Sequence, residues 1–167
     1  VLDRENKVAY ACISVRTDVD VLSNFCMLSG YKPVYFEAVD GQGFPIYHTN
    51  VMMCIGDRFA VICLAAIPDS MDREMVKRSL AGSGKEVIEI SIDQMNKFAG
   101  NMLQVAGKAG ESLLVMSEQA YLSLNTDQIT ALEKYAHIIH APLYTIEQNG
   151  GGSARCMLAE VHLQLRQ

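Results

Sequence analysis

NVMMCIGDRFAVICLA, residues 50–65, is the stretch that decides the fold of this chain. It holds two apolar runs, Asn50–Ile55 and Phe59–Ala65, on either side of the pair Gly56-Asp57. Glycine and aspartate are typical of tight turns, and apolar runs of this length are typical of buried strands. The stretch therefore predicts two strands joined by a short turn.

A helix and a third strand follow these two strands, and the same order recurs on both sides of the central unit. In the central unit the helix pattern covers Met71–Leu80 and the next apolar run covers Glu86–Ser91. Before it we expect strands at Val1-Leu2 and Lys7–Ser14, a helix at Thr17–Leu28 and a strand at Pro33–Val39. After it we expect strands at Asn101–Val105 and Ser112–Ser117, a helix at Asp127–Ile138, a strand at Leu143–Glu147, and a last run at Cys156–Leu163. Helix-capping residue types stand at Thr17, Ser70 and Thr126.

The chain is thus predicted to repeat a β-β-α-β unit. Matched strand starts at Asn50, Asn101 and Cys156 are 51 and 55 positions apart, a spacing typical of propellers and repeat arrays. We predict an α+β fold in a single domain, 1–167, with three units at about 1–39, 50–91 and 101–147 and a closing strand at 156–163. An ordinary α+β domain with accidental periodicity is the alternative.

Equivalent positions of the repeat are expected to meet. In a ring of such units Asn50, Asn101 and Cys156 would face one central cavity, and His48 lies two residues from the matching point. Three glycines, Gly150–Gly152, precede Cys156 and suit either a flexible turn or a close approach of the backbone to a ligand. The pattern predicts that this glycine loop brings the cysteine to the cavity.

Composition and charge limit the class of protein. Of 167 residues, 50% are hydrophobic and 20% charged, as in a compact globular domain. A net charge of −5 and the absence of a lysine or arginine run argue against a nucleic-acid partner. The longest apolar stretch, Phe59–Ile67, has the length of a strand and not the roughly 20 residues of a membrane span. Because the chain starts without an initiator methionine or a signal peptide, we interpret it as part of a longer protein.

The five cysteines predict free thiols. Their number is odd and no two are spaced as in a zinc site or a disulfide framework, so we expect no metal and no cofactor. Cys12, Cys26, Cys54 and Cys63 lie within apolar runs and are expected to be buried, whereas Cys156 follows the glycine loop. Free thiols indicate a reducing compartment, and we expect a cytoplasmic protein.

Three segments resemble motifs of the pentein, or guanidine-modifying, superfamily: SVRTD at Ser14–Asp18, HTN at His48–Asn50 and GGGSARCM at Gly150–Met157. Within it, HTNVMM, FAGNMLQ and GGGSARCMLAE are most similar to the arginine-deiminase-related subgroup of citrulline-utilisation hydrolases. The resemblance implies an α/β-propeller of five β-β-α-β units around one axis. This chain would hold three units and the opening strand of a fourth, an incomplete ring, and the preceding units would carry two acidic residues that bind the guanidinium group.

The resemblance also implies a function and roles for single residues. It implies hydrolysis of a C–N bond in a guanidino or ureido amino acid of the arginine or citrulline type. Cys156 would be the nucleophile that forms a covalent intermediate, and His48 the general acid and base. Arg16 would bind the α-carboxylate of the substrate, and Asn50 its head group, where deiminases have aspartate. Arg155 would add positive potential beside the thiol.

Alternatives to this reaction remain open. An amidinotransferase would use an amine in place of water in the second step, and a non-catalytic repeat or binding module would keep the cavity without the reaction. Simpler interpretations of the site are a structural thiol at Cys156, a turn histidine at His48 and a solvated arginine at Arg16. The expected partner is a small guanidino or ureido amino acid, without nucleic acid or membrane, and a homodimer is left open. The chain by itself is expected to be inactive, because its ring would be open.

Overall fold

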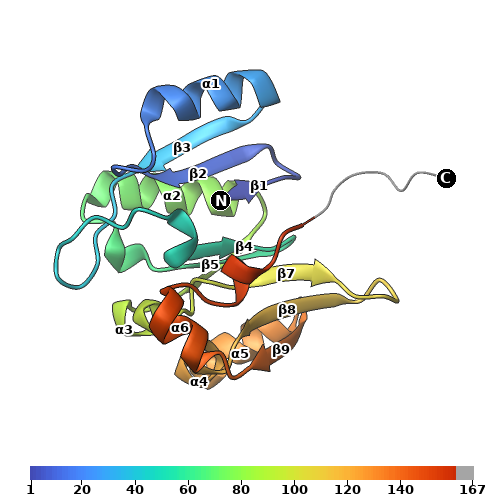
Figure 1. The fold of residues 1–167 in the computed structure, drawn as a ribbon. Helices are drawn as coiled ribbons and strands as arrows, with labels where there is room; N and C mark the ends of the chain where they lie inside the picture. Colours follow the sequence, from blue (N-terminus) through green and yellow to red (C-terminus); the bar gives the residue numbers. More distant parts are fainter. Residues whose placement is uncertain (161–167) are drawn as a thin grey trace.

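The computed structural model describes residues 1–160, whose strands form three separate sheets of three strands each (Figure 1). The first sheet holds β1 (Leu2–Asp3), β2 (Val8–Cys12) and β3 (Lys32–Phe36); the second β4 (Met53–Ile55), β5 (Phe59–Ile62) and β6 (Glu86–Glu89); the third β7 (Leu103–Ala106), β8 (Ser112–Ser117) and β9 (His137–Ala141). In every sheet the first two strands are antiparallel and the third runs parallel to the second. The predicted α+β class and the three β-β-α-β units are therefore present.

Helices make the parallel crossovers, as the connection between parallel strands requires. The crossover helices are α1 (Val19–Ser29), α2 (Ser70–Gly82) and the pair α4 (Glu118–Ser123) and α5 (Thr126–Glu133). Asp18, Asp69 and Asn125 cap α1, α2 and α5 with their side chains, each one residue from the position that the sequence suggested. The remaining helical segments are α3 (Ile92–Asn96), α6 (Tyr144–Gly150) and the 3₁₀ turns η1 (Thr49–Val51), η2 (Leu64–Ala66) and η3 (Ala154–Met157). None of the helices within residues 1–160 is both long enough and apolar enough to span a membrane.

The third unit corrects the prediction at its end. The helix predicted at Asp127–Ile138 ends at Glu133, and the closing strand is β9, not Leu143–Glu147, of which Tyr144–Glu147 lies in α6. The apolar pair Ile138-Ile139 fits a helical period, but β-branched residues also favour a strand, and here they pair in parallel with β8. A short apolar run cannot decide between the two by periodicity alone.

The run predicted as the strand Cys156–Leu163 begins as a turn. Ala154–Met157 is the 3₁₀ turn η3, closed by hydrogen bonds from the Cys156 amide to the Ser153 carbonyl (3.0 Å) and from the Leu158 amide to the Arg155 carbonyl (3.1 Å). Val161, His162 and Leu163 lie outside the described residues. The expectation of a strand at Cys156 was therefore wrong, since the backbone pairs locally there.

The core runs through the middle unit. All four residues of β5 are fully buried, because the first and third units flank the second on either side (Figure 1). The four cysteines predicted to be buried, Cys12, Cys26, Cys54 and Cys63, are buried, and all five cysteines are free thiols. The apolar runs around these cysteines thus form the core, as expected.

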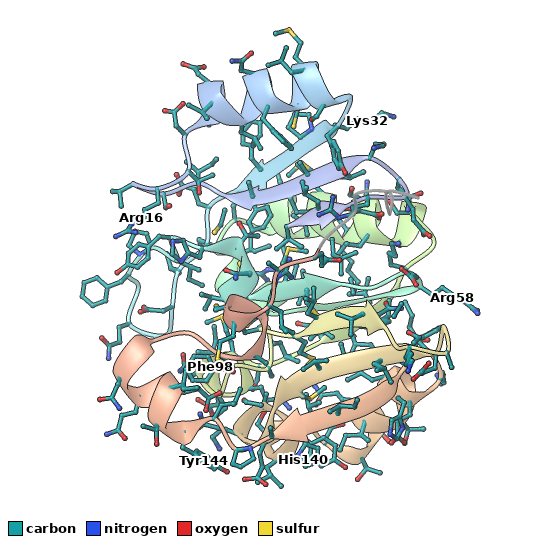
Figure 2. The ribbon with its side chains drawn as sticks, turned by 45° about the vertical axis from the view of Figure 1, so that its right-hand side comes forward. Arg16, Lys32, Arg58, Phe98, His140 and Tyr144 are labelled. Atoms are coloured by element: carbon teal, nitrogen blue, oxygen red, sulfur yellow. The ribbon has the colours of Figure 1, made fainter. Side chains whose placement is uncertain are left out.

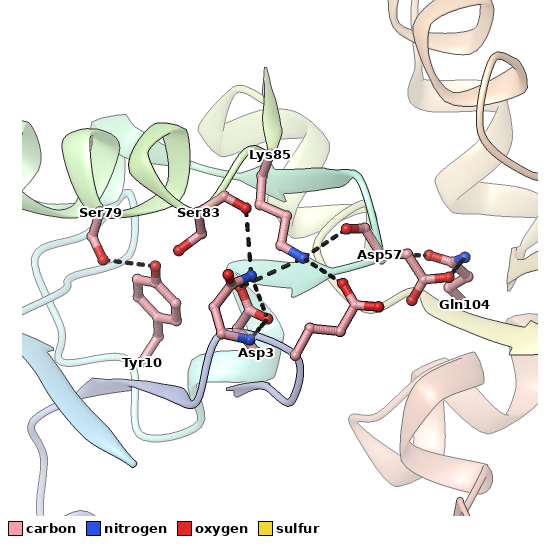
Figure 3. Close-up of polar contacts among 9 residues, drawn as sticks. Asp3, Tyr10, Asp57, Ser79, Ser83, Lys85 and Gln104 are labelled. Carbon is pink, nitrogen blue, oxygen red and sulfur yellow. Dashed lines mark hydrogen bonds and ion pairs between the residues drawn. The ribbon is translucent and has the colours of Figure 1, made fainter.

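Polar contacts join the first and second units near the β-hairpin turns (Figure 3). Lys85 is 5% exposed, and its Nζ donates to the Asp57 carbonyl at 2.7 Å and lies 3.5 Å from the Asp3 carboxylate, itself buried. Tyr10 and Ser79 of α2 share a hydrogen bond of 2.8 Å between their hydroxyl groups. Moving the two units apart would break the buried Lys85–Asp3 ion pair and leave an uncompensated charge. The ion pair and the hydrogen bond therefore fix the position of the first unit against the second.

Candidate active site

A cavity of about 530 Å³ lies among the connections that lead into the units, a volume that suits a small ligand. Its lining residues are Arg16, Tyr47, His48, Asn50, Val51, Met95, Asn96, Phe98, Asn101, Gly150, Gly151, Gly152 and Cys156. Four of the five site residues expected from the sequence are among them. Segments that are up to 140 positions apart in the chain, from Arg16 to Cys156, thus share one cavity.

Cys156 is the exposed thiol of the chain, whereas the other four cysteines are buried. It lies in η3, which follows directly on the glycine loop. Two hydrogen bonds to the buried Glu147 carboxylate anchor the loop: the buried Ser153 hydroxyl donates to one oxygen at 2.6 Å, and the half-buried Gln119 donates to the other at 3.1 Å. The thiol is therefore accessible to a ligand. The backbone that carries it is held in place by side chains of α4 and α6.

The three glycines have different structural roles. Gly151 ends α6 in the left-handed conformation, with φ of 67°, which favours glycine. A Cβ atom on Gly152 would lie 3.0 Å from the Cys156 Cβ and 3.1 Å from its Sγ, so this glycine allows the loop to lie against the cysteine. At Gly150 a Cβ atom would meet no atom within 4 Å. The glycine loop thus combines a helix-ending turn with a close approach to the thiol.

Two carboxamides face the thiol. The Asn101 Nδ2 lies 3.3 Å from the Cys156 Sγ, and the Asn50 Nδ2 lies 3.8 Å from the same atom. Asn101 is 2% exposed, and its Nδ2 also donates to the Asn50 backbone carbonyl at 2.9 Å. The three positions that the repeat aligned are therefore in contact, as predicted, although Asn50 and Cys156 lie in 3₁₀ turns and Asn101 precedes β7, so none of them starts a strand.

His48 precedes η1 and is exposed in the same cavity. The Tyr47 ring stands edge-on to the imidazole, with 6.0 Å between the ring centres. The adjacent Thr49 is buried, and its hydroxyl accepts a hydrogen bond from the Cys12 amide at 3.0 Å, which fixes the turn to β2. The histidine is thus carried on an anchored turn and is free to meet a ligand.

The two arginines of the predicted site lie in different cavities. Arg16 is exposed on the β2–α1 connection and lines the large cavity, and Figure 2 shows it on the same side of the molecule as Phe98, another lining residue. Arg155 lines a separate cavity of about 90 Å³, together with Asp3 and Glu160. Burial raises the pKa of the Cys54 thiol to about 11, and the charge of Arg155 opposes that shift. The structure therefore brings Arg16, but not Arg155, to the cavity of Cys156.

The electrostatics of the large cavity are neutral to basic. Among the described residues its lining has no carboxylate; arginine, histidine and three asparagine carboxamides supply the polar groups. Within residues 1–160 no cluster of His, Cys, Asp and Glu side chains suits a metal ion. The chemistry that these groups support is attack by a thiol, proton transfer by an imidazole and binding of an anion by a guanidinium.

Sequence reasoning gave Asn101 only as the counterpart of Asn50 and missed Tyr47, Asn96 and Phe98. Phe98 has a φ of 64°, a left-handed conformation that is uncommon for an aromatic residue. The repeat already pointed to this part of the site, because it aligned the segments around Asn50 and Asn101. What the alignment could not give is which side chain reaches the thiol.

Comparisons with known proteins agree on the fold. Residues 1–163 match the family described as N,N dimethylarginine dimethylhydrolase, eukaryotic. No curated protein sequence matches the chain at a significant level.

Solved structures of two other proteins are similar in fold. The N-terminal domain of ArgZ bound to product, an arginine dihydrolase from the ornithine-ammonia cycle in Cyanobacteria, is 17% identical with a TM-score of 0.73, over 93% of this chain and 52% of that one. The ternary complex of AgrE with ornithine and NAD⁺ is 20% identical with a TM-score of 0.72, over 100% of this chain and 22% of that one. The apo structure of ArgZ is 16% identical with a TM-score of 0.72, and this chain covers 23% of it.

This chain therefore spans about a quarter of the complete arginine dihydrolase and about half of its N-terminal domain. At these identities the likeness establishes a shared fold. The family match runs over nearly the whole chain and includes Cys156, His48, Asn50 and Asn101 of the cavity. We conclude that the chain belongs to the N,N dimethylarginine dimethylhydrolase family, within the pentein superfamily that its motifs resemble.

Proposed function

We propose that this chain supplies the cysteine and histidine part of an active site that hydrolyses a C–N bond in a guanidino or ureido amino acid. The observation that carries the proposal is the shared cavity of Cys156 and His48, in which the thiol is exposed and meets two carboxamide groups. The similar structures support a covalent route. One holds the N-terminal domain of an ArgZ variant covalently bound to a reaction intermediate, and another holds a cysteine-to-serine mutant bound to substrate.

In the first step the Cys156 thiolate attacks the central carbon of the guanidino or ureido group. The new C–S bond gives a tetrahedral adduct, which collapses as the C–N bond to the leaving nitrogen breaks. That nitrogen takes a proton from the imidazolium of His48 and departs as ammonia or an amine. The product of this step is a covalent thiouronium or thiocarbamoyl intermediate on the cysteine.

In the second step a water molecule attacks the same carbon. The now neutral imidazole of His48 takes a proton from the water, and the C–S bond breaks to release the thiolate. One molecule of water is consumed and one C–N bond is replaced by a C–O bond. An amine in place of water would give amidino transfer, which is the second candidate reaction and which a search for transfer products distinguishes.

Arg16 is proposed to bind the α-carboxylate of the substrate. Its guanidinium offers a planar pair of donors that matches a carboxylate, and its exposed position on the cavity wall leaves those donors available. Asn50 is proposed to contact the head group. A carboxamide can both donate and accept a hydrogen bond, so it suits a neutral ureido group as well as a guanidinium.

We further propose that the described units, in one domain over 1–167, belong to a ring of five, completed by units outside this sequence. Large apolar side chains remain exposed on α1: Val21 at 69%, Met27 at 75% and Leu28 at 79%. An apolar hollow lined by Val115, Ile139, Leu143, Met157 and other residues lies beside β8 and β9, in the third unit. Terminal repeats of a closed array would cover such surfaces. The acidic residues that bind a guanidinium would come from those units, in a cytoplasmic enzyme whose thiols stay reduced.

The experiment that tests the proposed function measures ammonia and the amine product from the full-length protein with arginine, citrulline, agmatine and methylated arginines, with and without EDTA. We expect turnover of at least one guanidino or ureido compound, unchanged by EDTA, and none from Cys156→Ser. Turnover that survives Cys156→Ser, or that EDTA stops, would overturn the covalent thiol mechanism. Binding without turnover, by a folded protein, would favour the non-catalytic module.

A further inference from the structure

We propose that Asn101 holds the Cys156 sulfur in its reactive, anionic form, through a carboxamide that its own backbone turn and the Asn50 carbonyl keep in one orientation. The inference rests on the proposed role of Cys156 as nucleophile. It assigns to a buried residue of the third unit a direct contact with the reacting atom.

The distances define the contact. The Asn101 Nδ2 is 3.3 Å from the Cys156 Sγ, and its Oδ1 is 3.5 Å from the same sulfur, so either protonation state of the thiol finds a partner. A protonated thiol donates to the oxygen, and a thiolate accepts from the nitrogen. The Asn50 Nδ2 is 3.8 Å from the sulfur and is the weaker donor of the two.

A second hydrogen bond decides which way the carboxamide points. The Asn101 Nδ2 donates to the Asn50 backbone carbonyl at 2.9 Å. If the amide were flipped, its oxygen would face that carbonyl oxygen, and two acceptors would meet in a buried site. The N–H donor is therefore held toward the sulfur before any substrate arrives.

The backbone under Asn101 is also fixed. The Asn101 amide donates to the Phe98 carbonyl at 2.8 Å, across a turn in which Phe98 has the left-handed φ of 64°. A Cβ on Gly100 would meet the Val51 carbonyl oxygen and the Met52 backbone, so the turn is in direct contact with the segment that carries Asn50. Non-glycine residues in this conformation persist where the surroundings enforce it, and such strain gathers at functional sites.

The cavity that holds the sulfur has basic groups in its lining. The described lining of the cavity has Arg16 and His48 as basic groups and no carboxylate. An aspartate at position 101 would place a negative charge against the sulfur, whereas the carboxamide provides a donor without charge. Hydrogen bonds to a charged group are stronger than those between neutral groups, so loss of the donor should reduce the thiolate population by about tenfold.

The test follows the rate of iodoacetamide labelling at Cys156 against pH, in the full-length protein, by mass spectrometry of the peptide that contains it. Asn101→Ala should move the midpoint of the profile upward by about one pH unit. Because nucleophilicity rises with basicity, the rate should fall about threefold below the midpoint and rise about threefold on the plateau above it. The variant and wild-type profiles therefore cross.

Asn24→Ala, on the exposed side of α1, is the matched control and should reproduce the wild-type profile. Asn101→Asp should shift the midpoint further in the same direction, and melting curves of both variants check that the chain is folded. A uniform change of rate at every pH, or profiles that superimpose, would overturn the role of Asn101. Crossing profiles in a protein that turns over no guanidino or ureido compound would leave the role intact and reject the proposed function instead.

Discussion

Gly152 leaves the space that the Cys156 side chain occupies, so the residue at position 152 determines where the sulfur can lie. A Cβ atom there would stand 3.0 Å from the Cys156 Cβ and 3.1 Å from its Sγ, closer than most real contacts of this kind. The relationship explains why a glycine precedes the cysteine at this distance along the chain.

Gly152→Ala should therefore displace the sulfur from the two carboxamides while leaving the fold intact. We expect turnover to fall by about 10-fold to 100-fold, since misplacing a reacting atom by about 1 Å has costs of that order. The melting temperature should change little. Gly82→Ala, where a Cβ atom meets no neighbour within 4 Å, is the control and should retain full activity. Equal activity of the two variants would contradict the role of Gly152.

Cys156 should be labelled first by a small electrophile at neutral pH. Burial raises the pKa of Cys12, Cys26 and Cys63 above its usual value, and that of Cys54 to about 11. A raised thiol pKa means that the protonated, unreactive form persists as the pH rises, so these four should stay unlabelled even near pH 9. Peptide mapping after brief iodoacetamide treatment measures the order. Labelling led by Cys12 or Cys63 in the folded protein would contradict it, and urea should remove the selectivity.

Arg16→Ala should raise KM more than it lowers kcat, if Arg16 binds the substrate carboxylate equally in the ground and transition states. Arg155→Ala provides a matched arginine control, because Arg155 lines the other cavity. Steady-state kinetics on a substrate with a carboxylate and on agmatine, which lacks one, separate the effects. Agmatine kinetics should be insensitive to Arg16→Ala. A larger KM effect from Arg155→Ala would show that the substrate reaches the smaller cavity.

Ser153→Ala should destabilise the glycine loop. The Ser153 hydroxyl is fully buried and donates to the buried Glu147 carboxylate, which within residues 1–160 then keeps the Gln119 donor alone. Loss of one partner of a buried charged group costs about 1–3 kcal/mol in the free energy of unfolding. Urea unfolding followed by circular dichroism measures it. Ser29→Ala, at the exposed end of α1, is the comparison and should cost less than about 0.5 kcal/mol.

His48→Ala should reduce turnover by roughly 10²–10⁴, the usual contribution of a positioned general acid and base. The exposed His137 on β9 lies outside the cavity, and His137→Ala should be close to wild type. Rates measured with a series of leaving groups show whether His48 acts in the first step. A better leaving group needs less protonation, so its turnover should suffer less from His48→Ala. If the defect is the same for all leaving groups, His48 does not protonate the departing nitrogen.

The sequence was informative where one signal dominated. The strand Ser112–Ser117 lies where the apolar run placed it, because a buried run between turn residues has one good solution. The hairpin around Gly56-Asp57 was also predicted, but its strands are shorter than the apolar runs: β4 begins at Met53, with Asn50 in η1, and β5 ends at Ile62. The end of the third unit was misassigned, because Ile138-Ile139 fits both periods and the β8 partner that decides is remote in sequence. Local pattern cannot supply a choice that depends on a distant strand.

In the candidate site, the alignment of repeat units was informative and adjacency in the chain was not. The repeat aligned Asn50, Asn101 and Cys156, and the structure has these three in contact. Arg155 was assigned to the site because it adjoins the cysteine, yet successive residues in a tight turn point in different directions, and it faces the smaller cavity. Adjacency in the chain is a weaker guide than equivalence between units.

The reacting groups stand on the connections between β-β-α-β units and not inside the sheets: His48 and Asn50 lead into the second unit, Asn101 into the third, and Cys156 follows it. A small rotation of one unit against its neighbour would therefore separate the thiol from its carboxamides while every strand stayed paired. Selection for activity then acts on these connections. The residues inside each unit can change as long as the volume of its core is kept. Under such selection the fold persists while most residues change, which agrees with the 16–20% identity between this chain and the structures that share its fold.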